Sequence, residues 1–366
     1  LLKNRLSITA DFYQRTTRDM IGPAESIPSI SGIASDDRAK VNNATLRNRG
    51  WELSVSWNDK LKCGFSYGIG FNVFNYKAVV TKYNNPEGII YNNHTGLAAN
   101  KGYYEGMDIG EIWGYRADDL FLSNREIDDY LRNVNLTAFK SNDLWRRGDL
   151  KYIDSNGDGR VDGGKGTLAD HGDLQIIGNT TPKYSFGINL NLGYKGFEIS
   201  TLLQGVAKRD FPISGSNYMF GGNNYNFKEH LDYFSTENPN GYLPRLTGWK
   251  DDKDFLVNTG YNTTRYLLNA AYMRMKNLTV GYTFNKKQLR HIGISNLKVY
   301  VTCDNLFTVT KLPKQFDPET LNQVNMSAGG DAQNTAPGLT SPMKQNGNGM
   351  VYPMNRNFVF GLDFTF

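Results

Sequence analysis

The chain has 366 residues, 39% of them hydrophobic, with a mean hydropathy of −0.52 and a formal net charge of +5. No run reaches the roughly 18 apolar residues of a membrane-spanning helix, which excludes a helical membrane protein. A transmembrane β-barrel remains possible, because its strands carry apolar residues only at every second position. The 41 basic and 36 acidic residues are scattered along the chain, and this small basic excess predicts no nucleic-acid partner. The two cysteines are too few for a disulfide framework.

Alternating polar and apolar residues predict eight strands. In chain order they lie near residues 4–13, 50–58, 62–76, 184–194, 196–207, 272–284, 296–309 and 356–366. In the last of them Phe358, Phe360 and Leu362 share one parity, and small, mostly polar residues share the other. Successive side chains of a strand point to opposite faces, so each segment has one apolar face. About ten residues is also the length that a tilted strand needs to cross a bilayer.

The connections between these strands alternate in length. Long ones lie near 14–49, 77–183, 208–271 and 310–355, and short ones lie near 59–61, 193–196 and 285–295. Outer-membrane barrels have short periplasmic turns and longer extracellular loops. We therefore predict an all-β protein, an antiparallel transmembrane β-barrel portion with four extracellular loops. Because strand-like sequence starts at once without a leader, the chain is interpreted as the C-terminal part of a longer protein.

The long connections are rich in Asn, Gly, Asp, Tyr and Pro, which predicts little apolar burial and irregular loops folded over the barrel mouth. Short helices are expected near 124–133, where Ser123 caps and Glu126 follows three residues on, and near 226–235. The loop aromatics either pack the loops together, which we favour, or stack on sugar rings. They are Tyr103, Tyr104, Trp113, Tyr115, Trp145, Tyr218, Tyr225, Trp249 and Tyr261.

One loop segment has the spacing of an EF-hand-type calcium loop. Its oxygen donors are the side chains of Asp154, Asn156, Asp158 and Asp162 and the backbone carbonyl of Arg160. The twelfth position, which should supply a bidentate carboxylate, is Lys165. Asp170 or Asp173 takes that place if the insertion 163–168 loops out. The sequence thus predicts a structural Ca²⁺ site, and the alternative is a tight loop held by Asx turns.

Catalytic patterns are absent from the sequence. His94, His171, His230 and His291 are scattered, and no HExxH, nucleophile elbow, P-loop or CxxC occurs, so no enzymatic role is predicted. A basic turn on the periplasmic side is interpreted as solvated, with lipid-headgroup contact as the second reading; it comprises Lys286, Lys287, Arg290 and His291. An aromatic girdle is expected at strand ends from Trp51, Trp57, Tyr194 and Phe197.

Several ordered segments together carry a family resemblance. They read NRLSITADFY (4–13), LRNRGWELS (46–54), GEIWGY (110–115), GDLKYIDSNGDG (148–159), IGNTTPKY (177–184), MRMKNLTVGY (273–282), DNLF (304–307) and the terminal strand. With them the whole chain resembles the C-terminal third of the SusC/RagA-type TonB-dependent outer-membrane transporters of Bacteroidetes. The resemblance implies a 22-stranded barrel, of which this chain supplies about eight strands, in the outer membrane of a Gram-negative cell.

The resemblance also implies partners and a function. Family members carry a plug domain and a TonB-interacting segment upstream, both absent here, and they work with a SusD-like surface lipoprotein. Their substrates are typically oligosaccharides, sometimes peptides, so TonB-dependent glycan import is expected. The family's calcium-loop motif falls on Asp154, Asn156, Asp158 and Asp162, with Lys165 as a departure. Two alternatives remain: an outer-membrane binding or adhesion barrel without transport, and a secreted, calcium-stabilised, glycan-binding β-sandwich.

Overall fold

The computed structural model describes residues 2–3, 5–22, 41–90, 103–117, 119–213, 228–247, 253–285, 289, 293–321 and 354–365. The strands are β1 (Leu6–Gly22), β2 (Val41–Lys60), β3 (Ser66–Lys82), β4 (Glu111–Gly114), β5 (Asp119–Leu120), β6 (Leu150–Lys151), β7 (Gln175–Asn179), β8 (Lys183–Tyr194), β9 (Phe197–Lys208), β10 (Asp210–Pro212), β11 (Leu267–Asn269), β12 (Tyr272–Phe284), β13 (Asn296–Asp304), β14 (Thr308–Thr310) and β15 (Asn357–Thr365). The helical segments are α1 (Asn124–Leu131), η3 (Asn142–Leu144), η4 (Lys228–Leu231), α2 (Lys253–Phe255) and η5 (Leu256–Gly260). Within the described ranges, none of them is long and apolar enough to cross a bilayer.

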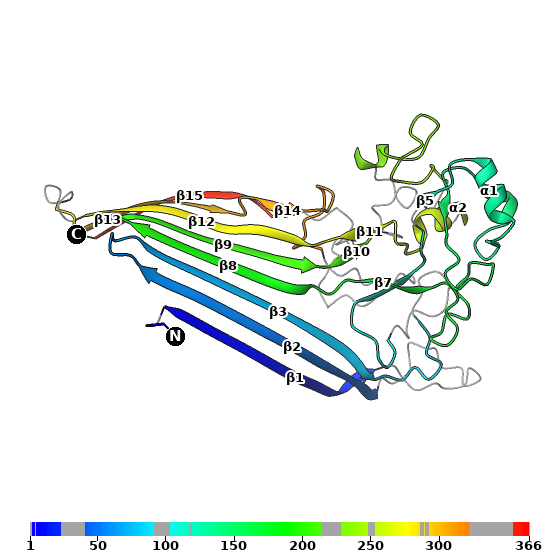
Figure 1. Ribbon diagram of the computed structural model, residues 1–366, viewed down its shortest axis with the longest axis horizontal. Coiled ribbons are helices and arrows are strands. Elements are labelled where there is room, and N and C mark those ends of the chain that lie inside the picture. The colour runs from blue at the N-terminus through cyan, green and yellow to red at the C-terminus, as the bar shows by residue number, and fades with distance from the viewer. Residues whose placement is uncertain are drawn as a thin grey trace.

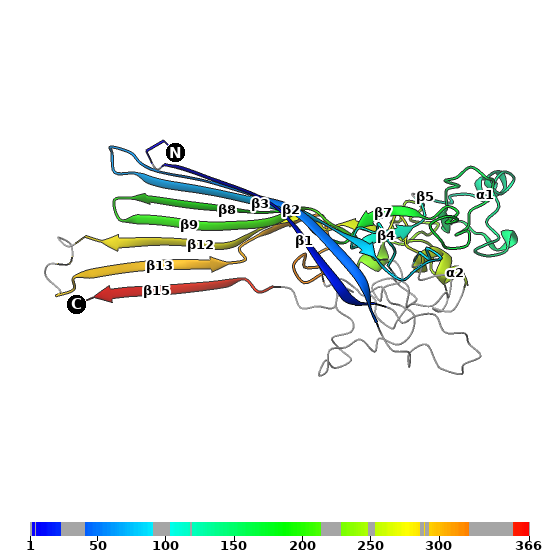
Figure 2. The same cartoon turned by 90° about the horizontal axis from the view of Figure 1, so that it is seen from below.

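One antiparallel sheet dominates the structure. Its strand order is β1-β2-β3-β8-β9-β12-β13-β15, and β14 pairs with β12 as the ninth strand. Figures 1 and 2 show these strands side by side in one curved layer, with the remaining segments gathered beyond one end of it. We call that end the loop end and the opposite end, where β2 turns into β3 and β8 into β9, the turn end. Three two-stranded sheets, β4-β7, β5-β6 and β10-β11, lie outside the main sheet.

The register between the strands places the apolar side of each strand on the same face of the sheet. Val55 pairs with Ile8 on one side and Phe71 on the other, and the same row continues through Ile188 to Leu203. On β15, Phe360 is 80% exposed, so its ring has no cover in the described structure. Within the described ranges this apolar face is not packed against a second sheet. The secreted β-sandwich, which needs a dry core between two layers, is therefore wrong.

The eight predicted membrane strands are present, but their ends differ from the prediction. β1 and β2 have 17 and 20 residues and extend through half of the loop that we expected at 14–49. Pairing continues there between residues such as Gln14 and Arg49, which are polar on both strands, so the alternation that marks a strand has disappeared. The strand expected at 296–309 ends at Asp304, and Asn305 follows with a φ of 52°. This left-handed residue breaks the strand before β14.

The expectation that the loops bury little apolar surface was wrong for their described residues. The largest buried cluster of the chain belongs mainly to these loops; it includes Tyr115, Phe121, Phe139, Trp145, Leu150, Tyr152, Val161, Leu174, Phe211, Leu243 and Tyr266. Composition averages over each loop, whereas the core is made by a few large side chains contributed by segments that lie far apart in the sequence. The preferred packing role of the loop aromatics is confirmed for Tyr115 and Trp145, which are buried.

The first predicted helix is confirmed, and the second is shorter than predicted. The Ser123 hydroxyl oxygen accepts a hydrogen bond from the Glu126 amide at 3.1 Å, and the Glu126 carboxylate accepts one from the Leu122 amide at 2.9 Å. The first bond satisfies an amide that the first helical turn leaves without a partner, and the second joins the helix to Leu122, the residue before the cap. Between 226 and 235 the described part contains only the single turn η4.

Candidate functional site

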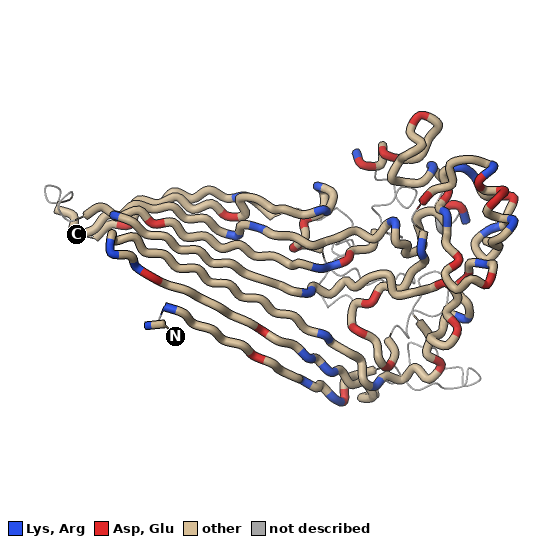
Figure 3. Tube along the Cα trace, in the orientation of Figure 1, with Lys and Arg blue, Asp and Glu red and all other residues tan. Residues whose placement is uncertain are grey.

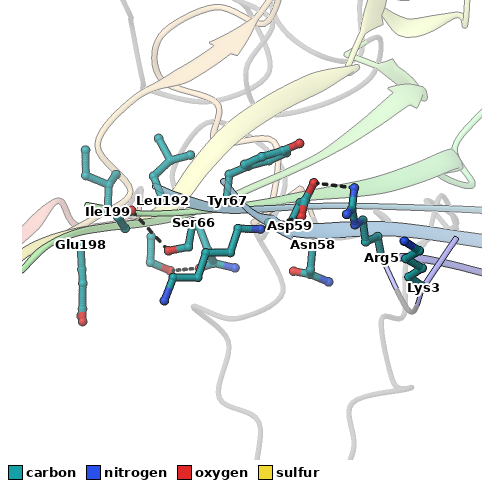
Figure 4. A pocket seen from close by; sticks show the side chains of 14 residues that line it. Lys3, Arg5, Asn58, Asp59, Ser66, Tyr67, Leu192, Glu198 and Ile199 are labelled. Atoms are coloured by element: carbon teal, nitrogen blue, oxygen red, sulfur yellow. Dashed lines mark hydrogen bonds and ion pairs between the residues drawn. The ribbon is translucent and has the colours of Figure 1, made fainter. Parts of the chain in front are cut away.

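The second face of the sheet is polar and forms the first candidate site. Many residues on this face have amide or hydroxyl side chains or are glycines. One example is the row of paired residues Asn72, Gly187 and Gln204 on neighbouring strands. At the turn end this region contains a hollow of about 680 Å³ lined by residues of β2, β3, β8 and β9. Figure 4 shows Asn58 and Glu198 on the opposite side of the sheet from Leu192 and Ile199. The sheet thus separates a hydrogen-bonding face from an apolar face.

Aromatic rings border the apolar face at the turn end. The Phe65 and Tyr67 rings are stacked with centroids 6.0 Å apart, and Tyr194 lies 6.4 Å from Phe65. The rings of Phe197 and Tyr282 lie 4.6 Å apart. This row contains three of the four girdle residues predicted from the sequence, Trp57, Tyr194 and Phe197; the Trp57 indole N–H donates to the Tyr67 hydroxyl at 3.3 Å. Amphipathic rings at this level suit the boundary between a hydrocarbon layer and water.

The segments beyond the loop end are joined by an aromatic core. Tyr152 is completely buried and stacks on Phe139 at a centroid distance of 4.4 Å. Tyr115 meets Tyr152 edge to face at 5.6 Å, and Tyr261 meets Tyr115 at 5.8 Å. The Tyr152 hydroxyl donates to the Val257 carbonyl, and burial raises the pKa of this tyrosine well above its ordinary value. The described parts of the two long loops 77–183 and 208–271 therefore fold as one unit.

Charged side chains at the edge of this core form what we call the loop clip: Lys140, Asp149, Arg245, Asp254 and Asn258. The Lys140 ammonium, completely buried, lies 2.7 Å from a carboxylate oxygen of Asp149 and 2.6 Å from one of Asp254. Arg245 contacts the same two carboxylates at 2.5 Å each. Burial works against ionisation of Asp254, but hydrogen bonds from Lys140 and Arg245 outweigh it and lower the pKa of this carboxyl. The clip thus joins 140–149 to 245–258.

A second polar cluster fastens the segment after β14 to the polar face. Arg274, which is 3% exposed, contacts Asp317 at 2.8 Å and Glu319 at 3.0 Å. Arg209 donates to the backbone carbonyls of Pro318 and Leu321. Sequence reasoning missed this cluster. The one signal was an arginine at the polar parity of β12, whose acidic partners lie more than forty residues farther along the chain.

The predicted calcium loop has its donors in one place, but they do not converge. The Asp154 carboxylate accepts hydrogen bonds from the Gly157 and Gly159 amides. Asp158 and Asp162 both contact the guanidinium of Arg160, at 3.3 and 3.1 Å. Among the described residues, no three acidic, histidine or cysteine side chains meet as a preformed metal site.

The two alternatives for the last calcium ligand lie in different places. Asp173 is 2% exposed, and its carboxylate accepts hydrogen bonds from the Ser155 amide at 2.6 Å and the Asp162 amide at 2.9 Å. Burial raises the pKa of this carboxyl, opposed by those amide bonds. The Asp170 amide instead bonds to Thr167, within the insertion. Asp173 is thus the acid that contacts both ends of the loop.

Other predicted residues have no common site. His171 contacts Trp113 at a ring distance of 5.6 Å, and His230 is buried, but neither joins a catalytic arrangement in the part of the chain described. Lys286, Lys287, Arg290 and His291 of the basic turn lie outside the described residues, as do His94, Tyr218, Tyr225 and Trp249.

The chain is similar along its whole length to TonB-dependent receptors. It is 26% identical over 369 residues to TonB-dependent receptor P3 of Formosa agariphila, covering all of this chain and 33% of that protein. It is 21% identical to TonB-dependent receptor SusC of Bacteroides thetaiotaomicron, covering 88% of this chain and 29% of that protein. The chain thus spans about a third of the length of these relatives. No protein-family model matches it.

A solved structure has the same fold. The structure of the RagAB peptide transporter superposes with a TM-score of 0.63 at 21% identity, covering 99% of this chain and 34% of that one. The single sheet with one apolar and one polar face is therefore part of the wall of an outer-membrane β-barrel of the TonB-dependent receptor class. Within that class the chain is similar to SusC and to RagAB, which supports its resemblance to the C-terminal barrel portion of SusC/RagA-type receptors.

Proposed function

We propose that this chain forms the C-terminal barrel wall and the outer loops of a transporter that imports oligosaccharides across the outer membrane, energised by TonB. The observation that carries the proposal is the division of the sheet into an apolar face and a polar face, together with similarity to TonB-dependent receptors over the whole chain. The apolar face then meets lipid and the polar face lines the lumen. The loop end is extracellular, since long connections are typical of that side.

The lining of the polar face supports a neutral, hydroxyl-rich substrate. Across β3, β8 and β9 most central positions of this face are amides, hydroxyls or glycines, such as Asn72, Asn189, Asn191 and Ser200, and Leu202 opposite Asn189 is an apolar exception. Such groups donate and accept hydrogen bonds without charge, as sugar hydroxyls require. A SusD-like lipoprotein at the extracellular mouth is the partner that we propose, and no enzymatic step is included. RagAB is described as a peptide transporter, so peptides are the competing substrate class.

Uptake in cells tests this proposal on the full-length receptor. Cells that express it with its lipoprotein are given a labelled oligosaccharide mixture or a labelled peptide mixture, with TonB present or deleted. TonB-dependent accumulation of oligosaccharide is the expected result. Accumulation of peptides alone would reassign the substrate. Surface binding that is equal with and without TonB, with no accumulation, would favour the adhesion barrel instead.

We also propose that the loop at 154–162 takes up Ca²⁺ as a structural ion. The ligands would be Asp154, Asn156, Asp158 and Asp162, the Arg160 carbonyl, and Asp173 in the twelfth role; the oxygen-rich donor set suits a hard cation. The Arg160 side chain, which lies between two of these carboxylates and is 63% exposed, must turn towards solvent for the ion to enter. When bound, the ion would supply charge compensation for these carboxylates and no catalysis.

Proteolysis of the full-length receptor in calcium or EDTA tests the metal. Calcium is expected to slow cleavage between 154 and 173 in the wild type. Asp158→Asn should abolish that effect, whereas Asp129→Asn, an exposed acid on α1, should preserve it. Equal cleavage of the wild type in both buffers would show that Asx turns alone hold the loop.

A further inference from the structure

Three basic side chains, which we call the basic row, lie together on the apolar face near the loop end: Arg47, Arg49 and Lys77. Arg49 and Lys77 are paired directly across β2 and β3, and Arg47 lies two residues farther towards the loop end on the same face. Arg49 and Lys77 are exposed. Figure 3 shows Lys and Arg positions gathered where β1, β2 and β3 approach the loop end.

On β1–β3, as far as these strands are described, the basic row has no acidic neighbour at the loop end of its own face. Like charges directly opposite one another in a sheet destabilise the pair. Among the paired positions of this face on β1–β3 the only acid is Asp59, which lies at the turn end, 3.1 Å from Arg5. Arg49 donates from Nε to the Gln14 amide oxygen at 2.6 Å, and within the described ranges no ion pair involves Arg47, Arg49 or Lys77.

Some basic residues elsewhere in the sheet have an acidic partner within the chain. Lys183 lies 3.6 Å from Asp108, and Lys298 lies 2.5 Å from Glu198. The exposed like-charged pair of Arg49 and Lys77 has no ion pair among the described residues, and an anion from outside the chain would compensate its charge. Because the row lies on the apolar parity, that anion does not come from the lumen.

The position of the basic row indicates the source of the anion. The next row towards the turn end pairs Phe12 with Trp51, followed by Leu53 and Val55 on β2. Two residues along a strand span about 7 Å, so the charges lie one step beyond the aromatic border of the apolar band. This is the depth of lipid headgroups, where arginine binds phosphate through two parallel hydrogen bonds.

We propose that Arg47, Arg49 and Lys77 bind the phosphate groups of a phosphorylated lipid in the leaflet on the loop side. The inference rests on the membrane placement in the proposed function but not on transport or on its substrate. A bound headgroup neutralises the cross-strand pair and anchors the long ends of β2 and β3. The lipid becomes a resident part of the outer rim of this wall.

Native mass spectrometry of the purified full-length receptor tests this inference. The protein is titrated with a diphosphorylated outer-leaflet glycolipid and with the same glycolipid after enzymatic removal of its phosphates. The wild type is expected to bind the phosphorylated form at least tenfold more tightly. Removal of one charge should weaken binding about fivefold, so Lys77→Gln loses about that factor and the triple variant R47Q/R49Q/K77Q loses the preference for phosphate.

The matched control removes three charges from the loop surface, R125Q/R132Q/R147Q, and should bind the glycolipid like the wild type. Heat-modifiable migration confirms that every variant is folded, and the measurement needs no import activity, so failed import leaves it interpretable. Wild-type affinity in the triple variant would overturn the inference. Equal binding of both glycolipid forms, or displacement of the lipid by millimolar inorganic phosphate, would also overturn it.

Discussion

The loop clip gives the sharpest test of how the outer segments are held together. Replacing Lys140 by methionine keeps the length of the side chain and removes a completely buried ammonium from two carboxylates at 2.7 and 2.6 Å. Removing one partner of a buried ion pair typically costs about 3–5 kcal/mol. Asp149 keeps Arg245 and Asn258, and Asp254 is partly solvated, so we expect the lower end, about 3 kcal/mol.

Hydrogen exchange in the full-length receptor measures this loss locally. A loss of about 3 kcal/mol corresponds to roughly a hundredfold faster exchange, and it should appear in peptides covering 148–152 and 254–260. The control Arg132→Met breaks an exposed ion pair with Asp129, 3.0 Å long, and should change exchange by no more than about twofold. A double-mutant cycle with Asp254→Asn isolates the pairwise coupling. Equal exchange in Lys140→Met and in the control would refute a stabilising role for the clip.

Three further outcomes are expected. Val301→Arg, on the apolar face, should cost about 2–4 kcal/mol and impair assembly into outer membranes, whereas Thr302→Arg on the polar face should assemble normally; equal assembly would contradict the assignment of faces. Gly196→Ala should slow assembly more than Gly64→Ala. Both glycines have a positive φ, but only at Gly196 would the new Cβ lie 2.6 Å from a backbone carbonyl oxygen. Equal assembly rates of the two variants would contradict this prediction. Because its folded pKa lies below the ordinary 3.8, Asp254 stabilises the clip fully above pH 3.8 and loses this contribution as pH falls through the folded value; exchange at 254–260 that is unchanged on acidification would argue against this.

The sheet was predictable because its signal is local. Alternation with a period of two assigns each residue of β8, from Phe186 to Leu192, to a face without knowledge of its neighbours. Alternating loop lengths then separated a barrel wall from a sandwich. The same reasoning failed at 14–22 and 41–49, because strands that leave the apolar layer keep their hydrogen bonds but no longer need apolar residues on one side.

The loops were not predictable in the same way. Lys140, Asp149 and Arg245 look like ordinary surface residues in the sequence, and they become a buried network only because two loops meet. Likewise, the sequence shows a calcium spacing with Lys165 at its twelfth position, whereas the fold determines that Asp173 contacts both ends of the loop.

The sequence by itself determined the strands, the assignment of their faces and the family that the wall resembles, since each follows from short-range periodicity or from ordered motifs. Only the tertiary structure decided which distant side chains form ion pairs and which, like Arg49 and Lys77, lie opposite a side chain of the same charge. The physical reason is that two charges compensate each other only at distances of a few ångströms. For residues far apart along the chain, the sequence does not give these distances.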